Sequence, residues 1–93
     1  MAIVHFDKNM AILSTRVRNE LDEIILILRS SPEINILAMT LSKTDNDLVT
    51  SNRLSAIKAY LKLKGISENR IEFKAYYSDS EASDIKVQFQ RRH

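Results

Sequence analysis

Apolar positions between residues 15 and 29 recur at helical spacing, and they predict an amphipathic helix. Ser14, or the threonine after it, can cap the start of this helix. Pro32 ends it, because the residue before a proline resists the α conformation. Leu26 and Ile27 lie off the apolar stripe, so this turn is either buried on two sides or in contact with a partner, and we favour burial. The stripe itself consists of Val17, Leu21, Ile24, Ile25 and Leu28.

A second helical pattern runs from about Val49 to Lys64. Gly65 follows at the point where a left-handed C-cap is needed, which gives the sole glycine of the chain a structural role. Ile66 is then placed to contact the last buried leucine of the helix, as in a Schellman motif. The inner stripe of this helix consists of Leu54, Ile57 and Leu61.

Four further segments predict strands. Residues 3–6 are β-branched and aromatic, residues 34–41 are apolar on both faces as in a central strand, and residues 71–77 and 85–90 alternate with a period of two. The connections at 42–47 and 78–83 are polar loops.

The element order is therefore β-α-β-α-β-β. The two helical crossovers permit parallel neighbours, whereas the short final connection favours an antiparallel hairpin of the last two strands. We predict an α/β (α+β) fold, a two-layer sandwich with two helices on one face of a mixed sheet. We expect one domain over residues 1–93, cut from a longer protein.

Composition removes many classes of enzyme. The chain of 93 residues has one glycine, no cysteine and two histidines. Glycine-rich phosphate loops, thiol catalysis and cysteine-ligated zinc are thereby excluded, and histidine is too scarce for a metal cage. We therefore expect no cofactor and no metal.

Charge and hydropathy restrict the partners. The net charge is +2, and cationic residues alternate with acidic ones, so we expect no nucleic-acid partner. The longest apolar run, Ile24–Leu28, is far too short to span a bilayer. The first residues carry no secretory signal, so the chain is either cytosolic or a domain of a longer secreted protein.

Several motifs, taken with the element order, resemble the OmpA-like domain, the peptidoglycan-associating module of bacterial envelope proteins. The first strand ends in the aromatic-Asp pair Phe6-Asp7, and residues 46–54 read Asn-Asp-Leu-Val-Thr-Ser-Asn-Arg-Leu. Residues 60–66 read Tyr-Leu-Lys-Leu-Lys-Gly-Ile, followed by Arg-Ile at 70–71 and Asp-Ile-Lys-Val-Gln-Phe at 84–89. The resemblance covers nearly all of the chain.

The resemblance implies a ligand site. In the family, an acidic residue after the second strand and the arginine of the second helix hold the diaminopimelate of the peptidoglycan stem peptide. Arg53 matches this arginine, whose two-pronged guanidinium suits the ligand's carboxylate. The resemblance also implies ligand-binding roles for Thr40, Asp45 and Asn46, and it implies no catalytic residue. The acidic position, however, falls on Leu41.

Two interpretations of this site remain open. In one, Asp45 supplies the missing carboxylate from the loop. In the other, the pocket is degenerate, because a leucine cannot neutralise the ammonium of the ligand. We favour the degenerate pocket. Without the resemblance, Arg53 would be an ordinary exposed helical arginine, and we interpret His5 as structural rather than as a general base.

The resemblance implies a non-enzymatic domain of the cell envelope, located in the periplasm and associated with the outer membrane. Its partners would be peptidoglycan, bound weakly or no longer, and other envelope proteins. The alternative is a structural or assembly domain of an envelope-spanning complex, such as a secretion system or a flagellar motor, that has lost peptidoglycan binding.

Overall fold

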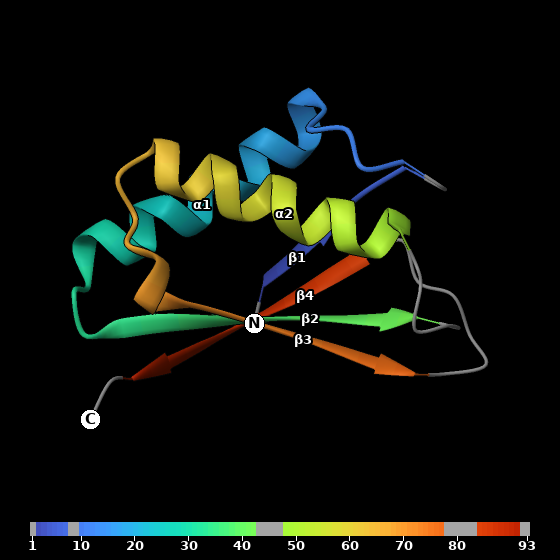
Figure 1. Ribbon diagram of the computed structural model, residues 1–93. Coiled ribbons are helices and arrows are strands. Elements are labelled where there is room, and N and C mark those ends of the chain that lie inside the picture. Colours follow the sequence, from blue (N-terminus) through green and yellow to red (C-terminus); the bar gives the residue numbers. More distant parts are fainter. Residues whose placement is uncertain (1, 8–9, 43–47, 78–83, 92–93) are drawn as a thin grey trace.

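A computed structural model of the chain describes residues 2–7, 10–42, 48–77 and 84–91. Two helices cover one face of a four-stranded sheet, and the other face of the sheet is open (Figure 1). In chain order the elements are β1 (Ala2–His5), α1 (Thr15–Ser30), β2 (Ile34–Ser42), α2 (Leu48–Leu63), the 3-10 turn η1 (Glu68–Arg70), β3 (Ile71–Tyr77) and β4 (Asp84–Arg91). The predicted two-layer α+β sandwich and its element order are confirmed.

The strand order in the sheet is β1-β4-β2-β3. β2 and β3 are parallel, as the helical crossover permits, with Ala38 opposite Phe73. β4 runs antiparallel to both β2 and β1, with Val87 opposite Ala38 on one side and opposite Ala2 on the other. The predicted hairpin of the last two strands is therefore wrong, because β2 lies between β3 and β4.

Burial accounts for this strand order. Ile85 and Val87 of β4 are 0% and 1% exposed, as expected for a strand that has neighbours on both sides and helices above it. Ala75 of β3 is exposed and Phe73 is only half-buried, as befits an edge strand. The short connection between β3 and β4 favours pairing of these two strands. Burial of the apolar side chains of β4 at the centre of the sheet is more favourable, so β4 lies there.

α1 forms where its apolar stripe predicts. The side-chain oxygen of Ser14 accepts a hydrogen bond from the backbone nitrogen of Val17 at 3.3 Å, which satisfies one of the free N–H groups of the first turn. The five residues of the predicted stripe are all buried. The outward positions Leu26 and Ile27 are 63% and 43% exposed, so the burial that we favoured for this turn is wrong.

α2 ends in the predicted Schellman motif. The N–H of Ile66 donates to the carbonyl of Leu61 at 2.9 Å, and the N–H of Gly65 donates to the carbonyl of Lys62 at 3.0 Å. Gly65 has φ of +88°, a conformation that side chains with a Cβ rarely adopt. Ile57 and Leu61 are buried as predicted, whereas Leu54 only packs against the edge of the core.

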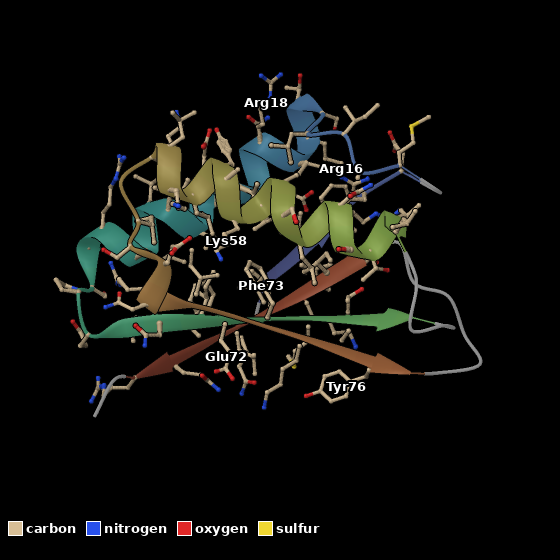
Figure 2. The ribbon with its side chains drawn as sticks, in the orientation of Figure 1. Arg16, Arg18, Lys58, Glu72, Phe73 and Tyr76 are labelled. Carbon is tan, nitrogen blue, oxygen red and sulfur yellow. The ribbon has the colours of Figure 1, made fainter. Side chains whose placement is uncertain are left out.

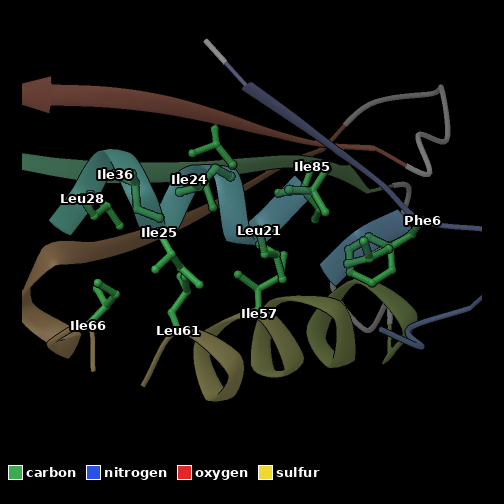
Figure 3. Packing of buried hydrophobic residues seen from close by; sticks show 14 residues of the cluster. Phe6, Leu21, Ile24, Ile25, Leu28, Ile36, Ile57, Leu61, Ile66 and Ile85 are labelled. Carbon is green, nitrogen blue, oxygen red and sulfur yellow. The ribbon is translucent and has the colours of Figure 1, made fainter. Parts of the chain in front are cut away.

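One apolar core lies between the helices and the sheet. Leu21 and Leu28 of α1, Ile57 and Leu61 of α2, and Ile85 of β4 all belong to this core (Figure 3). All five of these side chains have less than 2% of their surface exposed. At about 1.5–3 kcal/mol for each fully buried aliphatic side chain, this layer is the main source of stability.

Candidate functional site

Arg53, the arginine singled out by the sequence, points into the protein rather than into solvent. It is 4% exposed, although it lies on a helix of the outer layer. Its Nε donates to the carbonyl of Met10 at 2.6 Å, and its Nη2 donates to the carbonyl of Asp7 at 2.9 Å. The centre of the guanidinium lies 5.2 Å from the centroid of the Phe6 ring. The interpretation as an exposed helical arginine is therefore wrong.

These contacts tie α2 to the segment that follows β1. The two acceptors lie three residues apart, and a planar guanidinium can reach both from one fixed orientation. Phe6, which is itself 5% exposed, presents its ring to the guanidinium. The aromatic-Asp pair Phe6-Asp7, which directly follows β1, thus has a structural role: its ring and a backbone carbonyl both position Arg53.

Thr40 lies near the end of β2 and is 3% exposed. Its Oγ1 has no hydrogen-bond partner in the part of the chain that the structure describes, so the hydroxyl of Thr40 does not bond to Arg53. A buried hydroxyl without a partner is unfavourable, and such groups often mark a site that a ligand or water completes. Thr50 of α2 is similarly buried, at 5% exposed.

Two positions that the resemblance makes important, and the side chain of a third, lie outside the described part. Asp45 and Asn46 belong to residues 43–47, which the structure does not describe. The backbone of Leu41 pairs with Tyr76 in the ladder of β2 and β3, but its side chain is likewise outside the described part. The two interpretations of the acidic position therefore stay open.

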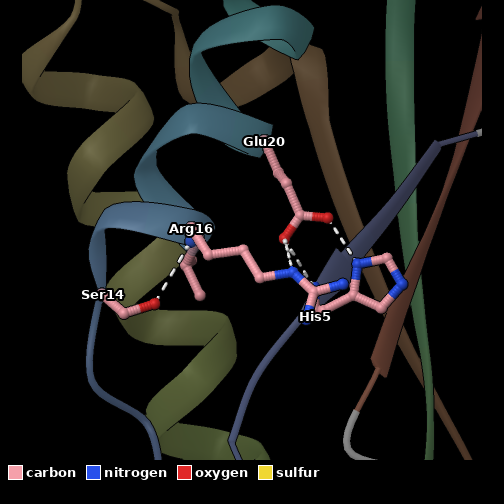
Figure 4. A network of polar contacts seen from close by, with 5 residues as sticks. His5, Ser14, Arg16 and Glu20 are labelled. Atoms are coloured by element: carbon pink, nitrogen blue, oxygen red, sulfur yellow. Dashed lines mark hydrogen bonds and ion pairs between the residues drawn. The ribbon is translucent and has the colours of Figure 1, made fainter.

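His5 forms a second polar cluster with residues of α1. Its Nδ1 contacts the carboxylate of Glu20, and its backbone N–H donates to Glu20 Oε1 at 3.1 Å (Figure 4). The Nε of Arg16 approaches the same oxygen at 3.8 Å, one helical turn away. One carboxylate of α1 thus binds both the backbone and the side chain of the last residue of β1. This supports a structural role for His5.

The described residues contain no group of three or more His, Cys, Asp or Glu side chains that could hold a metal ion. Within the same ranges, neither helix has the length and hydropathy that a membrane-spanning segment requires.

The chain matches no family model and no curated protein sequence. Its fold, however, matches solved structures closely. The C-terminal domain of MotB from Helicobacter pylori superposes with a TM-score of 0.72 at 14% identity, covering 97% of this chain and 84% of that one. The peptidoglycan-associated lipoprotein of Burkholderia pseudomallei gives a TM-score of 0.72 at 16% identity, covering 97% and 91%.

The OmpA-like domain of FopA1 from Francisella tularensis also superposes with a TM-score of 0.72, at 12% identity over 96% of this chain and 71% of that one. The protein therefore has the fold of OmpA-like domains, as its motifs predicted. Identities this low establish the fold alone, so the ligand has to be argued from the residues of this chain.

Proposed function

We propose that the protein is a non-enzymatic domain of the bacterial cell envelope that associates weakly with peptidoglycan near Arg53. The observation that carries the proposal is the match to the peptidoglycan-associated lipoprotein over 97% of this chain, with Arg53 held in a fixed orientation on α2. Periplasmic location follows from the same proposal, since another similar structure is a periplasmic domain of MotB.

Arg53 is suited to a carboxylate because its orientation is set before a ligand arrives. Its hydrogen bonds to the carbonyls of Asp7 and Met10 restrict the rotation of the side chain. A side chain that is already ordered loses little conformational entropy on binding. Since Arg53 is only 4% exposed, a stem peptide has to displace some of the chain around it, and this cost makes the association weak.

The buried hydroxyl of Thr40 supports the same location. Its Oγ1 lacks a partner among the described residues, at the end of the strand that leads toward α2. A polar ligand that supplied a hydrogen bond there would remove the penalty of an unpaired buried group. Asp45 and Asn46 belong to the connection between the same two elements, and the proposal includes them as contacts.

The test is an NMR titration of the ¹⁵N-labelled protein with a muropeptide whose stem ends in diaminopimelate. The matched ligand has lysine in place of diaminopimelate, which keeps the ammonium and removes the carboxylate that Arg53 would bind. We expect millimolar binding of the first ligand, with shifts at the backbone amides of Arg53 and Thr40, and at least tenfold weaker binding of the second. Equal shifts with both ligands, or none at millimolar concentration, would contradict the proposal.

The alternative, an assembly domain that has lost peptidoglycan binding, is favoured by one observation. Leu26 and Ile27 are adjacent on the outward side of α1 and are 63% and 43% exposed. A contact with another protein would remove this apolar surface from water. Absence of binding to either muropeptide would leave this function as the better account of the fold.

A further inference from the structure

A groove runs between the start of α1 and the outward face of α2, on the side of the helices away from the sheet. It has a volume of about 470 Å³ and an apolar floor. Ala56, Ala59 and Leu63 follow one another along one side of α2, and Leu13 closes the groove from the segment before α1. Leu63 is 83% exposed, so this floor is open to solvent.

The rim of the groove is basic. Arg18 and Lys64 both line it, and neither pairs with a carboxylate among the described residues. Figure 2 shows Arg18 on the part of α1 that faces away from the sheet. Lys64 Nζ lies 5.4 Å from the centroid of the Tyr60 ring. The hydroxyl of Tyr60 donates to Asp22 Oδ1 at 2.7 Å, so one carboxylate lies near this end of the groove, although Asp22 does not line it.

α2 contributes no acidic side chain to the groove. The helix contains no aspartate or glutamate from Leu48 to Leu63. Of its cations, Arg53 is buried, whereas Lys58 and Lys62 bind Glu68 at 3.3 Å and 3.0 Å. The helix dipole accounts for lysines in the last turn but not for the absence of acidic residues from the exposed face.

The shape of the floor indicates what kind of element fits. Ala56 and Ala59 lie one turn apart and carry the smallest side chain that a helix commonly uses, so the backbone of another element can come close there. Leu63 continues the same row one turn further on and offers apolar surface. A row of small residues followed by a leucine suits the apolar stripe of a helix.

A second copy of this chain does not suit the groove. In a two-fold dimer the same patch meets itself, which would bring Arg18 and Lys64 of one copy against those of the other. Like charges facing each other across an interface are unfavourable. The occupant therefore has to carry acidic residues beside its apolar stripe.

We propose that this groove docks an amphipathic helix of a partner protein, with its apolar stripe on Ala56, Ala59 and Leu63 and its acidic residues beside Arg18 and Lys64. The interaction uses a different surface from the region around Arg53. It does not depend on peptidoglycan association, so either proposal can fail alone.

The probe is a designed helical peptide of about 18 residues, long enough to form an isolated helix. It carries leucines at positions i, i+3, i+4 and i+7 and glutamates on both sides of them. The matched peptide keeps the leucines and replaces every glutamate by lysine. We expect the acidic peptide to shift the amide signals of Ala56, Ala59 and Leu63, and to bind at least about tenfold more tightly than the basic one at low salt.

Two pairs of substitutions separate the groove from general charge. Reversal of the rim by Arg18→Glu together with Lys64→Glu should weaken the acidic peptide by about tenfold or more. Lys74→Glu together with Lys86→Glu changes the net charge equally on exposed residues of the open sheet face, and should leave affinity within about twofold. Ala59→Gln, at an exposed position, should weaken binding by bulk alone, with the charges intact.

Sedimentation with vesicles of phosphatidylglycerol distinguishes an acidic lipid surface from a helix. If the rim reversal abolishes vesicle binding while the acidic peptide does not bind, the occupant is a membrane and the proposal is overturned. Equal affinity for the two peptides, equal effects of the two double substitutions, or peptide-induced shifts confined to the sheet face would also overturn it.

Discussion

The guanidinium of Arg70 donates two hydrogen bonds to the carbonyl oxygen of Ile34, from Nε at 3.2 Å and from Nη2 at 2.6 Å. Its Nη2 also donates to the carbonyls of Leu28 at 2.9 Å and Ser31 at 3.0 Å. One side chain just before β3 thus binds the end of α1 and the start of β2 together. A cation is favourable here, because the carbonyl end of a helix carries partial negative charge.

We expect Arg70→Ala to lower the free energy of unfolding by about 2–3 kcal/mol, because half-buried carbonyls lose a charged hydrogen-bond donor. Urea denaturation followed by circular dichroism measures this change. Arg91→Ala, at an exposed position in the last residue of β4, is the matched control and should change the free energy by less than about 0.5 kcal/mol. Equal losses in the two variants would contradict the role of Arg70.

Gly65→Ala should destabilise the protein through the backbone alone. Apart from Gly65 and its two chain neighbours, no atom among the described residues lies within 4 Å of the position that a Cβ would occupy, so the added methyl does not clash. The φ of +88° remains unfavourable for alanine and costs about 1–2 kcal/mol. Gly65→Asn should cost less, because asparagine tolerates this conformation better. Thermal and urea unfolding of both variants measure the difference, and an alanine variant as stable as the wild type would contradict it.

Local pattern was enough to predict both helices, the buried stripe of α1 and the cap at Gly65, because these features depend on residues only a few positions apart. In α2 it predicted Ile57 and Leu61 but missed the buried Thr50 and Arg53. The position of β4 between β1 and β2 depends instead on contacts between distant segments. Leu26 and Ile27 show a related limit. Hydropathy favours burying both, but the spacing of α1 gives its inner face to other residues.

The roles of Arg53 and Arg70 illustrate a second limit. Both donate to backbone carbonyls of distant segments, such as Asp7 for Arg53 and Ile34 for Arg70. Every residue has a carbonyl, so the acceptor leaves no mark in the sequence. These carbonyl partners therefore become apparent only in the folded chain.

We expect Arg53→Ala to lower the free energy of unfolding by about 2–4 kcal/mol, because it removes two charged hydrogen bonds and the contact with Phe6. Arg53→Lys should lower the free energy of unfolding by less, because the ammonium keeps the positive charge. Some loss should remain, because an ammonium cannot bond to both carbonyls as the planar guanidinium does. Asn52→Ala, at the exposed neighbouring position, serves as the control. Urea unfolding measures the stabilities of the three variants. If Arg53→Ala is no less stable than Asn52→Ala, the structural role of Arg53 is contradicted.

Glu68 should make stability depend on pH. Its hydrogen bonds to Lys62 and then Lys58 lower its pKa below the ordinary value of 4.5 in the folded protein. A carboxyl group whose pKa is lower in the folded protein stabilises the fold at any pH above its pKa in the unfolded chain. This contribution is lost as the pH falls through its pKa in the folded protein. The difference in unfolding free energy between wild type and Glu68→Gln should therefore be present at pH 7 and shrink below about pH 4.5.

Two controls identify the lysines as the cause of that effect. In the first control, Lys58 and Lys62 are both replaced by methionine. In this background, Glu68→Gln should change the free energy of unfolding at pH 7 by less than it does in the wild type. High salt should reduce it as well, because the carboxylate is about half exposed and its ion pairs are screened. A difference that persists without both lysines would assign the effect to another group.

Leu41→Asp tests why peptidoglycan association should be weak. If the pocket lacks only the acid that holds the ammonium of diaminopimelate, restoring it should tighten the muropeptide by about 30-fold or more, since such a partner contributes about 2–5 kcal/mol. Asp45→Asn should then leave the weak wild-type affinity unchanged. If Asp45 already supplies the carboxylate, the pattern reverses: Asp45→Asn removes binding and Leu41→Asp adds little. NMR titration of both variants with the muropeptide separates the two interpretations of the acidic position, and circular dichroism verifies that the variants fold. If neither substitution changes the affinity, both interpretations are contradicted.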